Sequence, residues 1–171
     1  MQFNDLLTDC FLRIRDDVQG VLDGLDPPDL QYRPDSEANT IAWVLWHLTR
    51  IQDDHVAELA GIEQVWTAEG WAARFGLPFD VSATGYGQTS ADVAAVSVGS
   101  DLLGGYHDAV HGMTAGFLSA VREPDLDRVV DERWDPPVTM GVRLVSVIED
   151  GLQHVGQAAY LKGLAKRSGS R

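Results

Sequence analysis

Three polar side chains at positions typical of buried residues carry the clearest chemistry in this sequence. Asp150 and His154 are four residues apart, so on one helix both side chains point the same way, about 6 Å apart. His47 stands in a second apolar segment, three residues after Val44 and four before Ile51, and borders its buried face. Two imidazoles and a carboxylate from facing helices predict a catalytic divalent-metal site with open positions. The alternative is a hydrogen-bonded core histidine, with Asp150 and His154 as an ion pair on a solvated flank.

The other histidines leave weaker alternatives. His55 lies two turns beyond His47, about 12 Å along the helix axis, too far to share an ion easily. His107 and His111 form a second pair with a spacing of four that can chelate a metal. That pair lies off the apolar stripe and beside several glycines, which favours a surface position or a subunit contact. Asp53 indicates a charged helix face, or an acceptor that orients a ligand.

No protein nucleophile is indicated, so activation is expected to come from the metal. Cys10, the single cysteine, precedes no histidine-bearing motif, and an inert thiol is expected. The sequence lacks a Gly-x-Ser-x-Gly motif, a phosphate loop and a dinucleotide fingerprint. One cysteine cannot form an internal disulfide, and the N-terminus lacks a basic and apolar leader. These features predict a cytoplasmic protein.

Length and charge exclude several classes of function. A chain of 171 residues with 44% hydrophobic residues corresponds to one core, which predicts a single domain over residues 1–171. The formal net charge of −13 repels a phosphate backbone, so we expect no nucleic-acid partner. The longest apolar run covers residues 41–46, whereas a membrane span needs about 20 residues, so no membrane partner is expected.

Four amphipathic segments must position the polar side chains. Apolar residues recur at steps of three and four in each of them. The predicted helices are residues 4–24, 37–60, 90–122 and 140–165. Ser36 or Asn39 is expected to cap the second helix and Thr139 the fourth. The pattern predicts an all-α four-helix bundle with a long crossover between helices two and three.

The last predicted helix has a regular apolar seam. Its members are Met140, Leu144, Val147, Gly151, His154, Ala158, Leu161 and Ala165. All except His154 are apolar or small, as bundle packing requires, so the imidazole needs a partner. Gly104, Gly105 and Gly112 in the third helix each cost about 1 kcal/mol relative to alanine, which predicts a kink or close helix contacts there.

The crossover between helices two and three is long, irregular and rich in aromatic residues. Connections of this length are uncommon unless they are functional. Residues 67–75 are expected to form two helical turns, and residues 128–134, beyond the third helix, an extended piece. Trp66, Trp71 and Tyr86 are candidate walls of a binding pocket for an apolar substrate or a cofactor; equally, they can be structural anchors.

Two segments of this sequence resemble a known family. Residues 41–48 (IAWVLWHL) and 150–157 (DGLQHVGQ) resemble the two signatures of the DinB/YfiT-like metalloenzyme superfamily, and the likeness covers nearly the whole chain. Members are four-helix bundles that hold a metal through one histidine of the second helix and two residues of the last, which implies His47, Asp150 and His154 here. Many members have histidine where this chain has Asp150, whereas related mycothiol-dependent maleylpyruvate isomerases have a carboxylate.

Residues 65–77 further resemble an actinobacterial branch of that superfamily that is similar to mycothiol transferases. The resemblance implies a metal-dependent thiol S-transferase or isomerase that activates a low-molecular-weight thiol such as mycothiol for attack on an electrophile. Zinc is the expected ion, with nickel or another transition metal as the alternative. A homodimer with a role in detoxification is also implied. The competing hypotheses are a non-catalytic dimeric bundle in stress response and a metal-dependent hydrolase that uses the same ligands.

Overall fold

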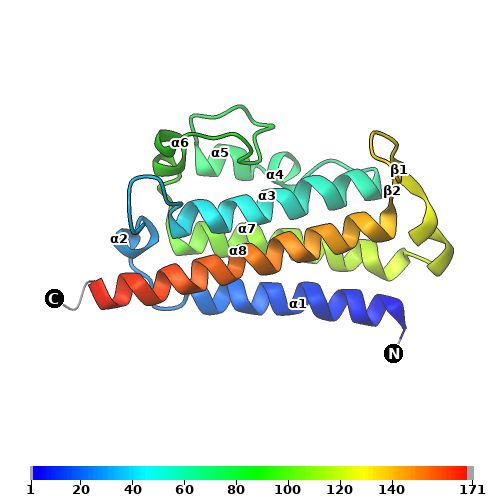
Figure 1. The fold of residues 1–171 in the computed structure, drawn as a ribbon, viewed down its shortest axis with the longest axis horizontal. Helices are drawn as coiled ribbons and strands as arrows, with labels where there is room; N and C mark the ends of the chain where they lie inside the picture. Colours follow the sequence, from blue (N-terminus) through cyan, green and yellow to red (C-terminus); the bar gives the residue numbers. More distant parts are fainter. Residues whose placement is uncertain (1, 169–171) are drawn as a thin grey trace.

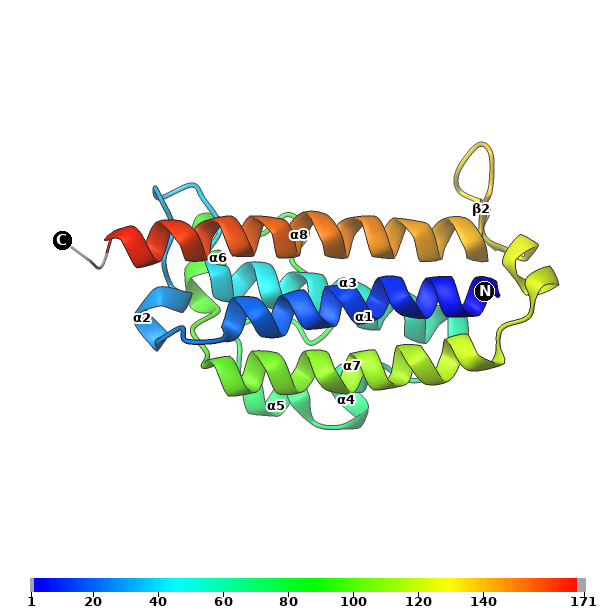
Figure 2. The ribbon, with the colours of Figure 1, turned by 90° about the horizontal axis from the view of Figure 1, so that it is seen from below.

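The computed structural model describes residues 2–168, and its main feature is a bundle of four long helices (Figures 1 and 2). They are α1 (Phe3–Leu22), α3 (Ile41–Ala60), α7 (Ser100–Ala120) and α8 (Met140–Ser168). The predicted all-α bundle, with its crossover between the second and third long helices, is confirmed. Met1 and residues 169–171 of the predicted domain lie outside the described residues.

The directions of the helices follow from their connections. Figures 1 and 2 show α3 and α7 running in the same direction, with α1 and α8 running the opposite way. A crossover that joins two parallel helices must return along the length of the bundle. Each of α3 and α1 packs against both α7 and α8, which closes the bundle around an apolar core.

The first connection contains a short helix that the sequence did not predict. Helix α1 ends at Leu22, two residues before the predicted end, and Gly24 follows with φ of 66°, a conformation that favours glycine. Residues Pro27–Leu30 then form α2. This helix begins with a pair of prolines, Pro27 and Pro28. Proline suits the first turn of a helix, where its missing N–H costs nothing.

Thr40, rather than Ser36 or Asn39, caps α3. Its hydroxyl accepts a hydrogen bond from the backbone N–H of Trp43 at 3.1 Å. The helix therefore begins at Ile41, four residues later than predicted.

The crossover forms a packed layer over α3 rather than a loose loop (Figure 1). It contains α4 (Val65–Ala68), α5 (Trp71–Phe75) and α6 (Ser90–Ala95). Because this layer covers the face of α3 turned away from the bundle, α3 is buried on nearly every side. Asp53, expected on a charged face, is consequently fully buried.

The predicted helix over 90–122 is broken in two. Helix α6 ends at Ala95 and α7 begins at Ser100, because Val96 leaves the helical conformation with ψ of 77° and its side chain is fully buried. Gly99 then occupies the cap position of α7. Residues 96–99 (VSVG) are weak helix formers, so the break falls where local helix propensity is low.

Gly104 and Gly105 of α7 permit close packing, as expected, whereas a Cβ atom on Gly112 would meet nothing within 4 Å. A Cβ atom on Gly105 would lie 3.0 Å from the Trp71 ring, and one on Gly104 would lie 3.2 Å from the Leu22 side chain. The chain between α7 and α8 contains a 3-10 helix, η1 (Glu123–Asp127), and an antiparallel pair, β1 (Val129–Asp131) and β2 (Val138–Thr139).

Helix α8 begins where the sequence predicted and buries most of the predicted seam. The Thr139 hydroxyl accepts from the backbone N–H of Val142 at 3.4 Å, as expected of its cap. One seam position differs, since Val155 is buried and His154 lies beside it at the edge of the core. Within residues 2–168, no helix combines the length and apolar character needed to span a bilayer.

Candidate metal centre

The three predicted ligand residues lie together between α3 and α8. His47 projects from α3, and Asp150 and His154 project from α8, which packs alongside α3. One ligand-capable atom from each residue lies within 4.8 Å of the corresponding atoms of the other two. Residues about 100 positions apart in the chain therefore bring three metal donors to one place.

His47 is held with one ring nitrogen free. Its Nδ1 atom bonds the backbone carbonyl oxygen of Thr84, and a carbonyl can only accept, so Nδ1 carries the proton. Nε2 is then left with the lone pair that a metal requires. The ring stacks on Trp43, with centroids 4.8 Å apart and planes 12° apart. Burial lowers the pKa of His47, which favours the neutral imidazole.

His154 is oriented in the same manner within α8. Its Nδ1 atom lies 2.9 Å from the backbone carbonyl oxygen of Asp150, so Nδ1–H donates and Nε2 is again free. The rings of His154 and His47 meet edge to face, with centroids 4.7 Å apart. The Asp150 carboxylate beside the ring raises the pKa of His154.

Asp150 supplies a carboxylate oxygen that lacks a hydrogen bond. Oδ2 lies 3.3 Å from Nδ1 of His154, but that N–H is directed at the backbone carbonyl, and Oδ2 is buried with no hydrogen-bond partner among the described residues. A buried charged oxygen is costly unless a donor or a cation compensates it. Two available imidazole nitrogens and this oxygen fit a divalent transition metal or zinc.

The cluster lies at the edge of the core. The side chains of His154 and Asp150 are 18% and 20% exposed, whereas the whole His47 residue is 4% exposed. Solvent therefore reaches the α8 side of the cluster but not the α3 side.

The structure separates the three predicted aromatic wall residues. Tyr86 is 74% exposed and meets His47 edge to face, with centroids 5.7 Å apart. Trp66 and Trp71 are buried and pack on Tyr106 at centroid distances of 5.1 and 5.6 Å. Tyr86 thus adjoins the metal ligands, while the two tryptophans belong to the core.

His55 and His107 are engaged elsewhere, and Nδ1 of His111 is buried with no hydrogen-bond partner among the described residues. Nδ1 of His55 lies 2.9 Å from a guanidinium nitrogen of Arg143. His107 is fully buried, with Nδ1 3.0 Å from the Thr49 hydroxyl, which corrects the expected surface or subunit-contact position. The physical reason is that α7 turns this residue toward α3 rather than toward solvent.

Two contacts of His47 were not found from the sequence. Trp43 stands four residues before His47 on one helix, so the stacking was inferable from spacing. Thr84 lies in an irregular stretch of the crossover, where no periodic signal fixes the path of the backbone.

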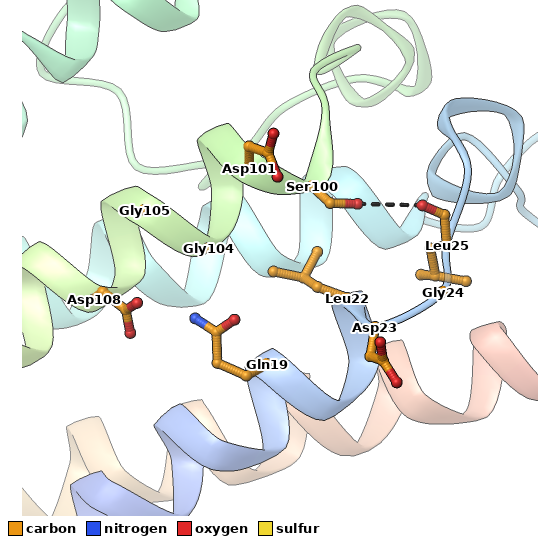
Figure 3. A pocket seen from close by; sticks show the side chains of 10 residues that line it. All are labelled: Gln19, Leu22, Asp23, Gly24, Leu25, Ser100, Asp101, Gly104, Gly105 and Asp108. Atoms are coloured by element: carbon orange, nitrogen blue, oxygen red, sulfur yellow. Dashed lines mark hydrogen bonds between the residues drawn. The ribbon is translucent and has the colours of Figure 1, made fainter.

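A cavity lies in another part of the bundle. It measures about 610 Å³ and lies between the end of α1 and the start of α7 (Figure 3). Its lining includes the carboxylates of Asp23, Asp101 and Asp108 and none of the three metal-ligand candidates. Size alone therefore does not identify the chemical centre of this molecule.

Comparisons with known proteins agree with this geometry. The model of the mycothiol S-transferase family matches residues 6–166. A crystal structure described as the conserved protein of a locus from Enterococcus faecalis is similar at a TM-score of 0.90 and 28% sequence identity, covering 96% of this chain and 98% of that chain. A search of curated proteins finds no match. The family match spans nearly the whole length and bears out the resemblance of the sequence, and the chain belongs to the mycothiol S-transferase family.

Proposed function

We propose that this protein is a divalent-metal-dependent thiol S-transferase that joins a low-molecular-weight thiol, such as mycothiol, to an electrophile. The observation that carries the proposal is the convergence of His47, Asp150 and His154 within 4.8 Å. Family membership supports the transfer of a thiol. The donor set supports the metal, because both histidines offer Nε2 and one Asp150 oxygen has no other partner.

The two histidines have one task in this proposal, and Asp150 has another. The Nε2 atoms of His47 and His154 are neutral donors, and the backbone carbonyls on their Nδ1 atoms fix the tautomer. The Asp150 carboxylate contributes one negative charge. When a divalent ion is bound, it supplies Lewis acidity that favours the deprotonated form of a thiol. The chain therefore needs no nucleophile of its own.

The exposed edge of the cluster is the proposed approach for both substrates. Solvent reaches His154 and Asp150, and the exposed ring of Tyr86 stands beside His47. In the transfer, the thiol loses its proton to solvent, a sulfur–carbon bond forms, and the leaving group departs with the electron pair of its bond to carbon. Tyr86 offers an apolar face to the electrophile.

Several finer assignments complete the proposal. Zinc is the ion we expect, because two imidazoles and a carboxylate are common zinc ligands and nickel accepts the same set. We also propose a single domain, a homodimer, a cytoplasmic location, and a role in removing toxic electrophiles. Trp66 and Trp71 keep a structural part in this scheme, and Tyr86 is the aromatic residue that we assign to the substrates.

Metal analysis and a conjugation assay together test the proposal. Protein purified without an affinity tag is expected to retain a stoichiometric divalent metal and to join mycothiol to chlorodinitrobenzene, releasing chloride and a proton. His47→Ala is expected to lose both properties. His55→Ala is the matched control, since His55 lies on the same helix outside the cluster.

Two results would contradict the proposal. Wild-type protein with no bound metal, and no gain on adding zinc or nickel, would favour a non-catalytic bundle. Metal-loaded protein that hydrolyses an ester but conjugates no thiol would instead favour the hydrolase reading.

A further inference from the structure

The crossover stretch that contacts His47 has no regular structure of its own. Residues 76–89 contain turns and bends but neither helix nor strand. Side chains from α3 and α4 hold it instead. Trp66 donates to the Val81 carbonyl, and Arg50 donates to the Ala83 carbonyl. His47 bonds to the Thr84 carbonyl, and Trp43 donates to the side-chain oxygen of Gln88. The path of this stretch is thus set by the helix beneath it.

Gly85 lies where this stretch passes close to His47 and Trp43. Its φ is +112°, which side-chain-bearing residues rarely adopt. A Cβ atom built on Gly85 would lie 2.5 Å from Nδ1 of His47 and 3.0 Å from the Trp43 ring. Glycine therefore lets the backbone pass close enough for the Thr84 carbonyl to meet the imidazole.

Arg50 holds the neighbouring carbonyl from inside the core. It is fully buried one turn after His47, and its Nε donates to the Ala83 carbonyl at 3.2 Å. Nη1 of the same guanidinium donates to the Tyr106 hydroxyl at 3.2 Å and lies 3.6 Å from Asp53 Oδ2. The guanidinium also stands over the Trp66 ring, 5.0 Å from its centroid.

Asp53 completes this buried group and fixes the guanidinium. It accepts from the backbone N–H groups of Val65 and Trp66 at 2.9 and 2.8 Å, and from the Tyr106 hydroxyl at 2.8 Å. A buried ion pair is an expensive way to obtain stability, because apolar residues of similar volume often serve as well. Here the ion pair holds Arg50 against the Ala83 carbonyl, which precedes the Thr84 carbonyl that orients His47.

We propose that Arg50 and Gly85 are positioning residues for the metal ligand His47. Arg50 fixes the Ala83 carbonyl, and Gly85 admits the backbone to the ring, so that the intervening Thr84 carbonyl holds His47 with Nε2 directed at Asp150 and His154. The inference rests on the proposed metal-dependent function. It adds that the buried group of Arg50, Asp53 and Tyr106 belongs to the machinery of the site.

A pair of glycine variants tests the close approach. Gly85→Ala is expected to raise the dissociation constant for zinc, measured by competition with a chromophoric chelator, by about tenfold or more. Gly87→Ala is the matched control. Gly87 also has a positive φ, +71°, but a Cβ there meets nothing within 4 Å. A backbone strain common to both positions would weaken zinc binding equally in the two variants, and this result would overturn the proposal.

A pair of arginine variants tests the buried anchor. Arg50→Lys keeps the charge but loses the planar fork that reaches Ala83 and Tyr106 together, and we expect zinc binding to weaken by about three- to tenfold. Arg143→Lys is the control, because Arg143 also contacts two side chains, His55 and Asp131, away from the crossover. Equal zinc affinities in the two variants would overturn a positioning role.

NMR of the ring nitrogens of metal-free protein separates this proposal from the proposed function. Wild-type His47 is expected as the Nδ1–H tautomer with a slowly exchanging ring proton, which Gly85→Ala and Arg50→Lys lose or exchange faster. A purely structural role would lower unfolding stability and leave this signal unchanged. If Gly85→Ala does not fold, the His47 ring signal of Arg50→Lys tests the positioning role. A protein that binds no zinc refutes the metal-dependent function, and the ring signal still decides the positioning.

Discussion

Two pairs of polar residues with the same spacing flank α3 and have different surroundings. Asp150 and His154 on α8 face His47, with their side chains about one-fifth exposed. His107 and His111 on α7 lie on the other side of α3, where His107 is fully buried against the Thr49 hydroxyl. A spacing of four aligns side chains on a helix. It does not decide whether they serve a site or the core.

The two pairs differ in burial and in the donors that meet there, not in the state of the ring nitrogens. His47 keeps a free ring nitrogen toward α8. Thr49 donates its hydroxyl proton to the Leu45 carbonyl at 2.8 Å, so it can only accept from His107. Nε2 of His107 is therefore also left free, but it is buried without a hydrogen-bond partner among the described residues. A candidate ligand set forms where three donors meet and solvent has access, as at His47, Asp150 and His154, whereas His107 lies wholly within the core.

Removing His47 is the strongest test of this comparison. His47→Ala deletes one of three donors and is expected to weaken zinc binding by at least about 100-fold, beyond the effect of losing a residue that only orients a ligand. Isothermal titration of metal-free protein measures the change. His107→Leu should bind zinc as the wild type does. Equal losses in both variants would place the ion elsewhere.

The His107 side of the comparison predicts a dependence of stability on pH. Burial lowers the pKa of His107 to about 4 from the ordinary 6.5. Between these pH values the unfolded chain binds a proton at this residue and the folded chain does not, so stability falls as the pH drops from 6.5 to 4. The loss from this residue is on the order of 3 kcal/mol.

Denaturant unfolding of metal-free wild type and His107→Leu at several pH values isolates that contribution. The variant should lose less stability on acidification, because leucine does not titrate. Other groups titrate in both proteins, so the difference between the two curves reports His107 alone. Superimposable curves would mean that His107 is not held neutral in the folded state.

The carboxylate of the α8 pair is expected to matter less than His47. Asp150→Asn keeps an oxygen donor but removes its charge, and the zinc dissociation constant should rise by about tenfold. Glu149→Gln removes the same charge from the neighbouring exposed position and serves as the control. Similar effects of the two substitutions would indicate general electrostatics in place of ligation.

The smallest expected effect concerns the open side of the α8 pair. Tyr86→Ala should raise the KM for the electrophile by roughly fivefold, about 1 kcal/mol for an aromatic contact, with zinc affinity unchanged. Tyr160→Ala, at a tyrosine of α8 that is 68% exposed, is the control. Steady-state conjugation kinetics provide the measurement, and an unaltered KM would remove Tyr86 from the substrate path.

The sequence predicted the convergence of His47, Asp150 and His154 because helical periodicity fixes the direction of side chains. It did not predict Thr84 or Gly85, whose positions depend on bonds to side chains distant in the chain. Periodicity also placed Asp53 toward solvent. That error has a physical cause, since a one-sided pattern cannot indicate that another segment covers the polar face.

The break in the predicted helix over 90–122 has a related cause. The apolar spacing on both sides predicted continuity, but residues 96–99 (VSVG) are weak helix formers and Val96 is buried in the core. The bundle itself was predictable because its long helices carry repeated apolar positions. Short elements, such as α2, depend on one or two residues and on neighbours that the sequence does not reveal.

The covering of α3 by the crossover limits how this family can diversify. In many folds a loop above the active centre can be exchanged during evolution while the scaffold remains intact. Here the segment that supports His47 also seals Trp46 through Phe79 and Trp66. An insertion in this segment would disturb both the packing of Trp46 and the support of His47. In the proposed thiol transfer, acceptance of new electrophiles is therefore expected to arise by single replacements around Tyr86 and along the solvent side of α8.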